Sequence, residues 1–198
     1  MKRVTDAGFY EFTPYTVSKT GIWVKCPACG GHGIVTSDYP DAEFRCTDCG
    51  AIKHKDLGNY RLSVHAQCKK CGKYFREDVS ENHKGNAAHV TCPECGAVMS
   101  GRIERIHKHN WYYYDVAAEH SKEPFFGYEL WYSGELDGKP VWALNREHLN
   151  YMIEYLGAEL REKAVPMRHQ ADHLPKFMKL AKNRDAIVKL LEKMREKG

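Results

Sequence analysis

Cys26-Pro27-Ala28-Cys29-Gly30 is the first of four stretches that share the pattern Cys-x-x-Cys-Gly. The other three are Cys46-Thr47-Asp48-Cys49-Gly50, Cys68-Lys69-Lys70-Cys71-Gly72 and Cys92-Pro93-Glu94-Cys95-Gly96. We refer to each stretch as a knuckle. Two intervening residues let both sulfurs of a knuckle reach one tetrahedral ion at about 2.3 Å. The glycine can adopt a positive φ without steric cost, so the turn can close around the metal. The eight cysteines are therefore predicted to bind two structural zinc ions, each held by four thiolates.

The spacing of the knuckles favours pairing in sequence order but leaves the alternatives open. The gaps are 16 residues (30–45), 18 residues (50–67) and 20 residues (72–91), and these lengths are similar. Sequential pairing joins the first knuckle to the second and the third to the fourth. An interleaved cross-brace, or a pairing of outer with inner knuckles, stays possible because no gap is distinctive.

Short strand-like runs flank the knuckles and predict a ribbon fold for each half. These runs are 22–25, 43–45, 60–64 and 88–91, and the turn-rich stretches 37–41 and 81–86 lie between them. The order strand, knuckle, hairpin, knuckle thus occurs twice. The predicted division is an N-terminal arm (1–19), ribbon 1 (20–58), ribbon 2 (59–104) and a C-terminal module (105–198).

Two other uses of the cysteines are less favoured. A disulfide set would suit a secreted chain, but the N-terminal residues 1–6 lack the apolar core of a secretory signal. We therefore expect a cytoplasmic protein with reduced thiols. A catalytic zinc ion normally keeps three protein ligands and an open position, whereas two knuckles supply four. Histidines near the knuckles could replace a cysteine, but exposed ribbon histidines are the simpler interpretation. These are His32, His54, His65, His83 and His89.

The Cys-Pro-x-Cys-Gly segments at 26–30 and 92–96 resemble the zinc ribbons of the transcription-factor-IIB type. The resemblance covers residues 20–104. It implies a fold and a metal but no single function, since similar ribbons occur in transcription factors, polymerase subunits, ribosomal proteins and other nucleic-acid machinery.

Residues 105–145 are predicted to be β structure, which makes the whole chain an α+β protein. Strand-prone aromatic runs lie at 111–116 and 125–132, and Asp137-Gly138 between two strand-like runs predicts a hairpin. The aromatic residues could form a base-stacking platform, but the core of a small sheet is the simpler interpretation.

Two or three helices are expected to follow. Asn145 is a suitable N-cap for a helix over 146–163 that ends before Pro166, and a second helical region begins near Leu174-Pro175. Its apolar stripe is interpreted as core, with a homodimer seam as the alternative. Its opposite face is basic, and residues 164–198 carry a net charge of +5. The nucleic-acid-binding candidates on this face are Lys176, Lys179, Lys182, Arg184 and Lys189.

The segments 142–149, 174–178 and 181–184 resemble the C-terminal module of uncharacterised bacterial zinc-ribbon proteins. This resemblance implies a bacterial origin and adds no chemistry. Glu147/His148 could form an acid/base pair and His169/His173 could bind a metal, but neither pair has a nucleophile or a third ligand nearby. We therefore expect no enzymatic activity.

The formal charge of +4 is modest, and two zinc sites of four thiolates each, at −2 per site, would cancel it. No stretch is long and apolar enough for a membrane span, so no membrane partner is expected. The leading hypothesis is a non-catalytic zinc protein that binds DNA or RNA through its basic C-terminal face. The alternative is an adaptor whose ribbons dock a protein partner.

Overall fold

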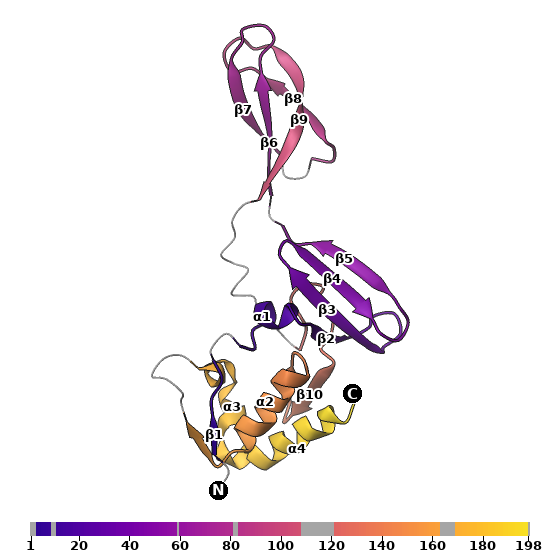
Figure 1. Ribbon diagram of the computed structural model, residues 1–198, viewed down its shortest axis with the longest axis vertical. Helices are drawn as coiled ribbons and strands as arrows, with labels where there is room; N and C mark the ends of the chain where they lie inside the picture. Colours follow the sequence, from indigo (N-terminus) through magenta and orange to yellow (C-terminus); the bar gives the residue numbers. More distant parts are fainter. Residues whose placement is uncertain are drawn as a thin grey trace. The chain divides into compact units, whose positions relative to one another are not determined.

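The computed structural model describes residues 3–8, 11–58, 60–80, 83–107, 121–162 and 169–197 (Figure 1). The chain forms two compact units. Unit 1 is composed of Met1–Leu57 and Tyr112–Gly198, and unit 2 is the intervening Gly58–Trp111. Ribbon 1 and the C-terminal module, which the sequence-based division kept apart, thus belong to one unit.

Ribbon 1 is an antiparallel sheet in the order β2-β3-β4-β5. Its strands are β2 (Ile22–Lys25), β3 (His32–Asp38), β4 (Asp41–Cys46) and β5 (Ile52–Asp56). Buried and less buried residues alternate along β2, β3 and β4, so one face of the sheet enters the core. Strand β5 is exposed at every position and forms one edge of the sheet.

The N-terminal arm is built into unit 1. Strand β1 (Arg3–Thr5) pairs in parallel with β12 (Leu160–Glu162). Helix α1 (Pro14–Ser18) follows, and the Oγ1 of its N-cap residue Thr13 accepts a hydrogen bond from the Thr16 N–H at 3.2 Å. Proline suits the start of this helix because it lacks a backbone N–H, and an N–H at the first helical position would have no intrahelical partner.

The hairpin predicted at Asp137-Gly138 is confirmed. Strands β10 (Tyr132–Leu136) and β11 (Lys139–Ala143) pair with Leu136 opposite Lys139, which leaves a two-residue turn. Both turn residues have positive φ, 52° at Asp137 and 71° at Gly138, as a type I′ turn requires.

Asn145 caps the next helix as predicted, but the helix is shorter than expected. The Asn145 Oδ1 accepts a hydrogen bond from the His148 N–H at 2.9 Å, and α2 spans Arg146–Gly157. The sequence predicted a helix to residue 163. Residues 160–162 instead form β12, because they pair with β1 from the opposite end of the chain.

The C-terminal segment consists of short helical turns followed by a longer helix. These elements are η2 (Gln170–His173), α3 (Lys176–Lys179), η3 (Ala181–Asn183) and α4 (Arg184–Arg195). The α4 residues Ile187, Leu191 and Met194 are at most 1% exposed and lie in one core with α2 and β10. The apolar stripe is therefore core, as the simpler interpretation held.

The aromatic run at 125–132 is largely a turn, not the predicted strand. The Glu123 carboxylate, which is 1% exposed, accepts hydrogen bonds from three backbone N–H groups, those of Phe125 (2.6 Å), Phe126 (2.9 Å) and Tyr128 (2.9 Å). Phe126 and Tyr128 pack on Phe44 of the ribbon 1 sheet, so the aromatic residues serve as core. The predicted strand at 111–116 and Pro166 lie outside the described residues.

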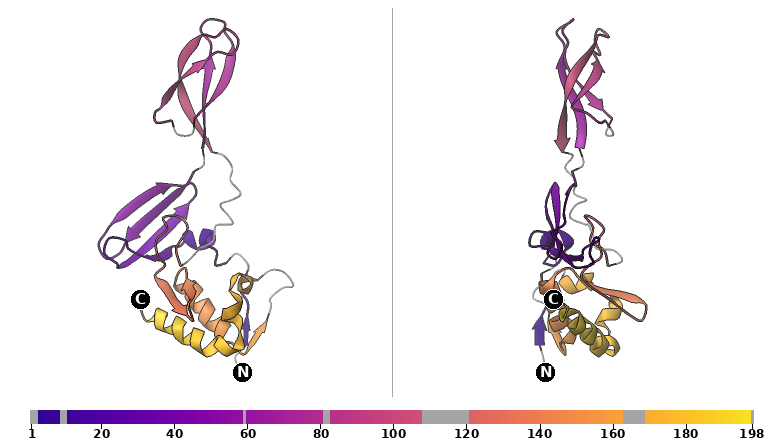
Figure 2. Two further views of the ribbon diagram at one scale, coloured as in Figure 1. Left: turned by 180° about the vertical axis from the view of Figure 1, so that it is seen from behind. Right: turned by 90° about the vertical axis from the view of Figure 1, so that its right-hand side faces the viewer.

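Unit 2 contains ribbon 2, an antiparallel sheet in the order β7-β6-β9-β8 (Figure 2). Its strands are β6 (Tyr60–Gln67), β7 (Tyr74–Val79), β8 (Ala87–Thr91) and β9 (Val98–His107). Strands β6 and β9, the first and last strands of the unit, pair with Tyr60 opposite His107. No helix in the described part of the chain is long and apolar enough to cross a membrane.

Candidate metal centres and charged surfaces

The eight cysteines form two groups in which the knuckles pair in sequence order. The groups are Cys26, Cys29, Cys46 and Cys49 in ribbon 1, and Cys68, Cys71, Cys92 and Cys95 in ribbon 2. All sulfurs of a group lie within 4.8 Å of one another. The structure therefore favours sequential pairing over the interleaved alternatives.

The distances between sulfurs fit a tetrahedral zinc ion. In ribbon 1, the Sγ–Sγ distances are 3.8 Å for Cys26–Cys49 and 3.7 Å for Cys29–Cys46. In ribbon 2, they are 3.5 Å for Cys68–Cys95 and 3.6 Å for Cys71–Cys92. Four sulfurs at about 2.3 Å from one ion are separated by roughly 3.8 Å, whereas a disulfide bond is about 2.05 Å long. Each site can thus hold one zinc ion, and all eight thiols are free of disulfides.

The knuckle backbone supports the sulfurs in the same way in both ribbons. The glycines after the second cysteines have φ between 69° and 77°, and in ribbon 1 the Gly30 N–H donates to the Cys26 carbonyl at 2.9 Å. Backbone N–H groups also point at the sulfurs. That of Ala28 donates to Cys26 Sγ, and that of Lys70 donates to Cys68 Sγ, each at 3.4 Å. These dipoles stabilise thiolates, which are the form that binds zinc.

In each site the pKa of one first cysteine of a knuckle is lowered, and the pKa of a second cysteine is raised. The backbone N–H of Cys49 lowers the pKa of Cys46 to about 7, and that of Cys71 lowers the pKa of Cys68 to about 6. For Cys29 and Cys71, the N–H groups of Gly31 and Lys73 act to lower the pKa. Contacts with the neighbouring thiols and partial desolvation outweigh them and raise the pKa to about 12 in each case. Zinc uptake must therefore displace protons from the thiols with raised pKa.

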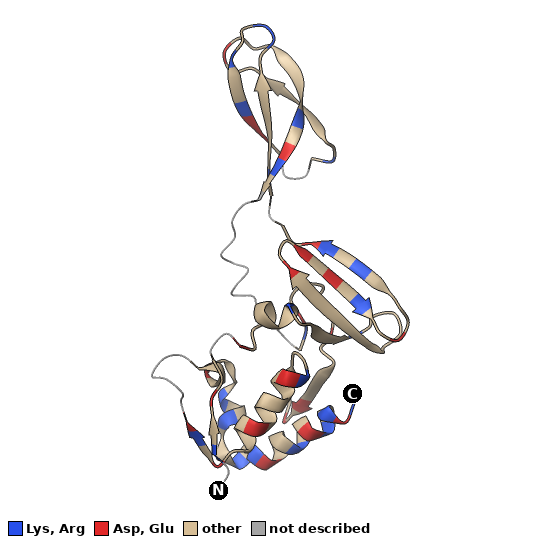
Figure 3. Ribbon diagram, in the orientation of Figure 1, with Lys and Arg blue, Asp and Glu red and all other residues tan. Residues whose placement is uncertain are grey.

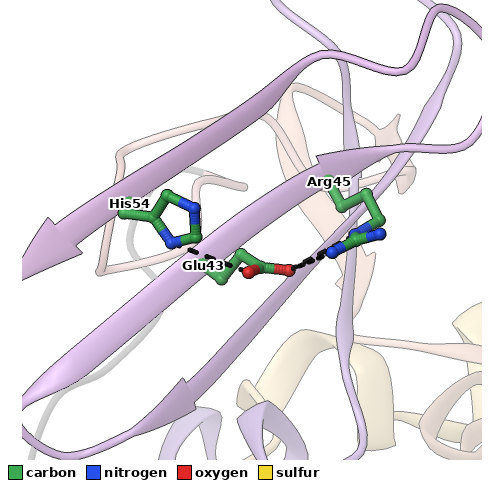
Figure 4. A network of polar contacts seen from close by, with 3 residues as sticks. All are labelled: Glu43, Arg45 and His54. Carbon is green, nitrogen blue, oxygen red and sulfur yellow. Dashed lines mark hydrogen bonds and ion pairs between the residues drawn. The ribbon is translucent and has the colours of Figure 1, made fainter.

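The histidines beside ribbon 1 lie outside the metal groups. The His32 ring packs edge-on against Trp23 (centroids 4.6 Å apart) and Trp131 (5.2 Å), and burial lowers its pKa. The His54 Nδ1 lies 3.6 Å from the Glu43 carboxylate, which also contacts Arg45 at 3.2 Å (Figure 4). Within the described residues, each metal group consists of cysteines alone.

The predicted nucleic-acid-binding residues are unequally available. Lys176, Lys182 and Lys189 are exposed. Lys179 and Arg184 are half-buried, and the Lys179 Nζ donates to the Ala171 carbonyl at 2.9 Å. Two acidic residues, Asp185 and Glu192, lie among the four basic ones of α4 (Figure 3). The C-terminal face is therefore less uniformly basic than its sequence indicated.

The other candidate pairs have structural surroundings. His148 is 3% exposed, its ring stacks on Phe12 with centroids 5.0 Å apart, and its Nδ1 accepts a hydrogen bond from the Leu144 N–H at 3.3 Å. Burial lowers its pKa to about 3. His169 is buried while His173 is exposed, and the two share no three-residue metal group within the described residues.

No family model, curated protein or solved structure matches this chain. The resemblance to transcription-factor-IIB-type ribbons thus rests on the knuckles, and the supported statement is that two four-cysteine sites can each bind a metal ion. The sequence-based interpretation also overlooked a feature of ribbon 2. The first knuckle of this ribbon, which is the third of the chain, contains Lys69 and Lys70. It is followed by Tyr74, which is 74% exposed. A comparison of the knuckles with one another would have found it.

Proposed function

We propose that this protein is a non-catalytic, zinc-stabilised nucleic-acid-binding protein whose second ribbon supplies the main contact with phosphate. The observation that carries the proposal is the distribution of charge between the units. Residues 58–111 contain nine Lys/Arg and five Asp/Glu, whereas the rest of the chain contains 21 of each. The whole excess of +4 thus belongs to unit 2. With one zinc ion bound to four thiolates, unit 2 keeps a charge of about +2 and unit 1 has about −2.

The lysines of ribbon 2 are concentrated at its metal end. Lys69 and Lys70 lie between the cysteines of the third knuckle, and both are exposed. Lys73 follows and pairs with Glu94 of the fourth knuckle at 3.2 Å. Within the described residues, neither Lys69 nor Lys70 forms an ion pair, so both are available to phosphate.

These lysines are not needed to offset the charge of the metal site. Ribbon 1 holds an equivalent four-cysteine site, yet its knuckles contain no Lys or Arg and include Asp48. The cations directly before its knuckles are paired, Lys25 with Glu129 at 2.9 Å and Arg45 with Glu43 at 3.2 Å. The exposed lysines of β5, Lys53 and Lys55, lie over aromatic rings of their own unit. Two sites of the same composition therefore differ in surroundings, which favours a separate role for the lysines of ribbon 2.

A groove on unit 2 adds to its basic surface. Gly85, Asn86 and the β9 segment Arg102–Ile106 line this groove, which has a volume of about 720 Å³. Its arginines, Arg102 and Arg105, are exposed. Guanidinium groups bind phosphate well because they donate two parallel hydrogen bonds. The exposed C-terminal residues Lys176, Lys182 and Lys189 are proposed as an additional contact.

Fluorescence anisotropy with the zinc-loaded full chain tests this function. Labelled single-stranded DNA, duplex DNA and RNA would be titrated at 50 to 200 mM salt. We expect affinity that falls steeply with salt, and a slope that decreases by roughly 1.4 for single strands when Lys69 and Lys70 are both changed to Gln. The matched control changes Lys19 and Lys53, exposed lysines of unit 1, to Gln, and we expect the slope to stay unchanged. Absence of binding at low salt and micromolar protein would contradict the proposal.

One observation favours the alternative of a protein adaptor. Among the described residues of unit 2, Tyr74, Val98 and Ile106 are large apolar side chains that remain exposed. Exposed apolar groups also suit a protein partner. An adaptor would capture its partner with little dependence on salt and would tolerate Gln at Lys69 and Lys70, so the same variants separate the two functions.

A further inference from the structure

The two ribbons differ at one equivalent position, the third residue after the second cysteine of the first knuckle in each ribbon. In ribbon 1 this residue is His32, and in ribbon 2 it is Tyr74. The His32 ring is half-buried between Trp23 and Trp131 of its own unit. The Tyr74 ring is 74% exposed. The side chain at this position is therefore packed against aromatic rings in ribbon 1 and exposed in ribbon 2.

The backbone beneath Tyr74 is held by the metal site. Cys71, a ligand, lies three residues before it, and the Cys68 N–H donates to the Lys73 carbonyl at 2.8 Å. The Gln67 Nε2, from the residue paired with Tyr74, donates to the Gly72 carbonyl at 3.4 Å. The next residue, Phe75, packs against the small core of ribbon 2. Tyr74 is thus an exposed ring on a firmly held strand end, which reduces the entropy lost on binding a partner.

The surroundings of Tyr74 indicate the chemistry of that partner. Lys69, Lys70 and Lys73 all lie within five residues of it, and the first two are exposed and free of ion pairs within the described residues. An exposed ring beside several cations suits a ligand that combines a flat aromatic group with negative charge. A nucleotide in a single strand has both, because its base can stack and its phosphate is anionic. In a duplex, the faces of the bases are covered by their neighbours.

We propose that Tyr74 stacks on an unpaired base of single-stranded nucleic acid, while Lys69 and Lys70 contact the adjoining phosphates. This inference rests on the proposed function and narrows it to a single-stranded ligand. It assigns the ring to base contact and the two lysines to the backbone. Such stacking tolerates any base, so we expect little sequence specificity from this site.

Three substitutions at Tyr74 test the role of the ring. Tyr74→Phe keeps the ring, Tyr74→Leu keeps an apolar side chain without it, and Tyr74→His installs the aromatic residue of the equivalent position in ribbon 1. The measurement is anisotropy of the zinc-loaded full chain with a labelled single-stranded oligothymidylate and with a duplex. The matched control is Ile52→Ala, since Ile52 follows the second knuckle of ribbon 1 by the same spacing and is 48% exposed.

We expect Tyr74→Leu to weaken single-strand binding about 10- to 100-fold. The single-strand affinity of Tyr74→Phe and Ile52→Ala should stay within about twofold of that of the parent. The affinity of Tyr74→His should lie between those of Tyr74→Leu and the parent. Duplex binding should change little in every variant. Zinc content and circular dichroism confirm that each variant is folded, and the exposed position makes loss of folding unexpected. Salt-dependent single-strand binding that is the same in Tyr74→Leu as in the parent would overturn the inference and leave the proposed function standing. A parent protein that binds no nucleic acid would overturn both.

Discussion

The two ribbons have the same knuckles but opposite strand orders. In ribbon 1, the strands between the knuckles, β3 and β4, lie at the centre of the sheet, whereas in ribbon 2 the strands outside the knuckles, β6 and β9, take that place. Among the described residues, ribbon 1 lies in a core of eleven buried residues that includes Phe125, Leu130 and Leu144 from the second half of the chain. In the described part of ribbon 2, the core cluster has five buried residues besides the buried ligands Cys68 and Cys92, and all of them belong to the ribbon itself.

This difference implies that the two ribbons depend on metal to different degrees. Four of the five side chains in the core cluster of ribbon 2 are Leu, Val or Ile and contribute roughly 1.5–3 kcal/mol each, and Ala88 contributes less, which is little for ordering a unit of this length. Structural zinc can supply the rest, since its apparent binding free energy in small zinc domains is about 10–16 kcal/mol. Ribbon 1 shares a core with segments that bind no metal. Metal removal should therefore affect the two units unequally.

The largest expected effect is that of zinc removal. Complete chelation should unfold unit 2, because little else holds its strands, while the α2–α4 core of unit 1 should stay folded. Amide hydrogen exchange, read by mass spectrometry before and after chelation, would measure both units in one sample. Metal analysis of the untreated protein should find two zinc ions per chain.

Cysteine substitutions provide the matched control for chelation. Cys71→Ser with Cys95→Ser should remove protection from β6 to β9 and leave α2 and α4 unchanged. Cys29→Ser with Cys49→Ser should affect the ribbon 1 sheet and leave unit 2 unchanged. Equal loss of protection in both units from either pair would show that the ribbons are not independent.

The next effect in size is that of a cavity in the core of unit 1. Leu191 is fully buried in α4, so Leu191→Ala should lower the free energy of unfolding of unit 1 by about 2–5 kcal/mol. Denaturant unfolding followed by tryptophan fluorescence would measure this loss. Amide exchange in unit 2 should be unchanged, and a parallel loss there would contradict the separation into two units.

Acid should destabilise unit 1 through His148. Burial holds its folded-state pKa at about 3, below the ordinary value of 6.5, so the unfolded chain binds a proton first as pH falls. Above pH 6.5 His148 is neutral in both states and has no effect on the pH dependence of stability. As the pH falls from 6.5 to the folded-state pKa, the free energy of unfolding decreases by on the order of 1.4 kcal/mol per pH unit. Unfolding free energies at pH 7, 6 and 5 should show a shallower fall in His148→Gln than in the parent. Equal slopes would show that His148 does not carry this dependence.

The smallest expected effect concerns the start of α2. Asn145→Ala removes the side-chain acceptor of the His148 N–H and should destabilise unit 1 by about 1 kcal/mol. Asn150→Ala is the matched control, since Asn150 is an exposed residue within the same helix and should cost little. The difference in melting temperature between these variants measures the effect of the cap. Equal melting temperatures would contradict a capping role for Asn145.

Local signals allowed part of this structure to be predicted from the sequence. The knuckles, the Asp137-Gly138 turn and the Asn145 cap each depend on a few adjacent residues, and the structure contains all three. The end of α2 could not be predicted, because β12 forms by pairing with β1 near the opposite end of the chain. The aromatic run after Glu123 resembles a strand in composition, but the buried carboxylate gathers the N–H groups of that segment into a turn.

The charged surfaces show the same limit. The sequence places an excess of basic residues at the C-terminal end. The Lys179 Nζ in this segment, however, donates a hydrogen bond to the Ala171 carbonyl. That contact depends on how α3 folds back on η2, which no local pattern records. The exposure of Tyr74 likewise could not be predicted, because it depends on whether distant segments pack against the ring. Ribbon 1 shows that an equivalent position can be packed by its own unit.

The most direct test of this account is amide hydrogen exchange of the zinc-loaded full chain with and without a single-stranded oligothymidylate. We expect the oligonucleotide to slow exchange in the third knuckle and the start of β7, from Cys68 to Arg76. Exchange at the first knuckle of ribbon 1, from Cys26 to His32, should be unchanged. Protection of the ribbon 1 knuckles without any change in ribbon 2 would contradict the central claim that the second ribbon is the nucleic-acid-binding surface.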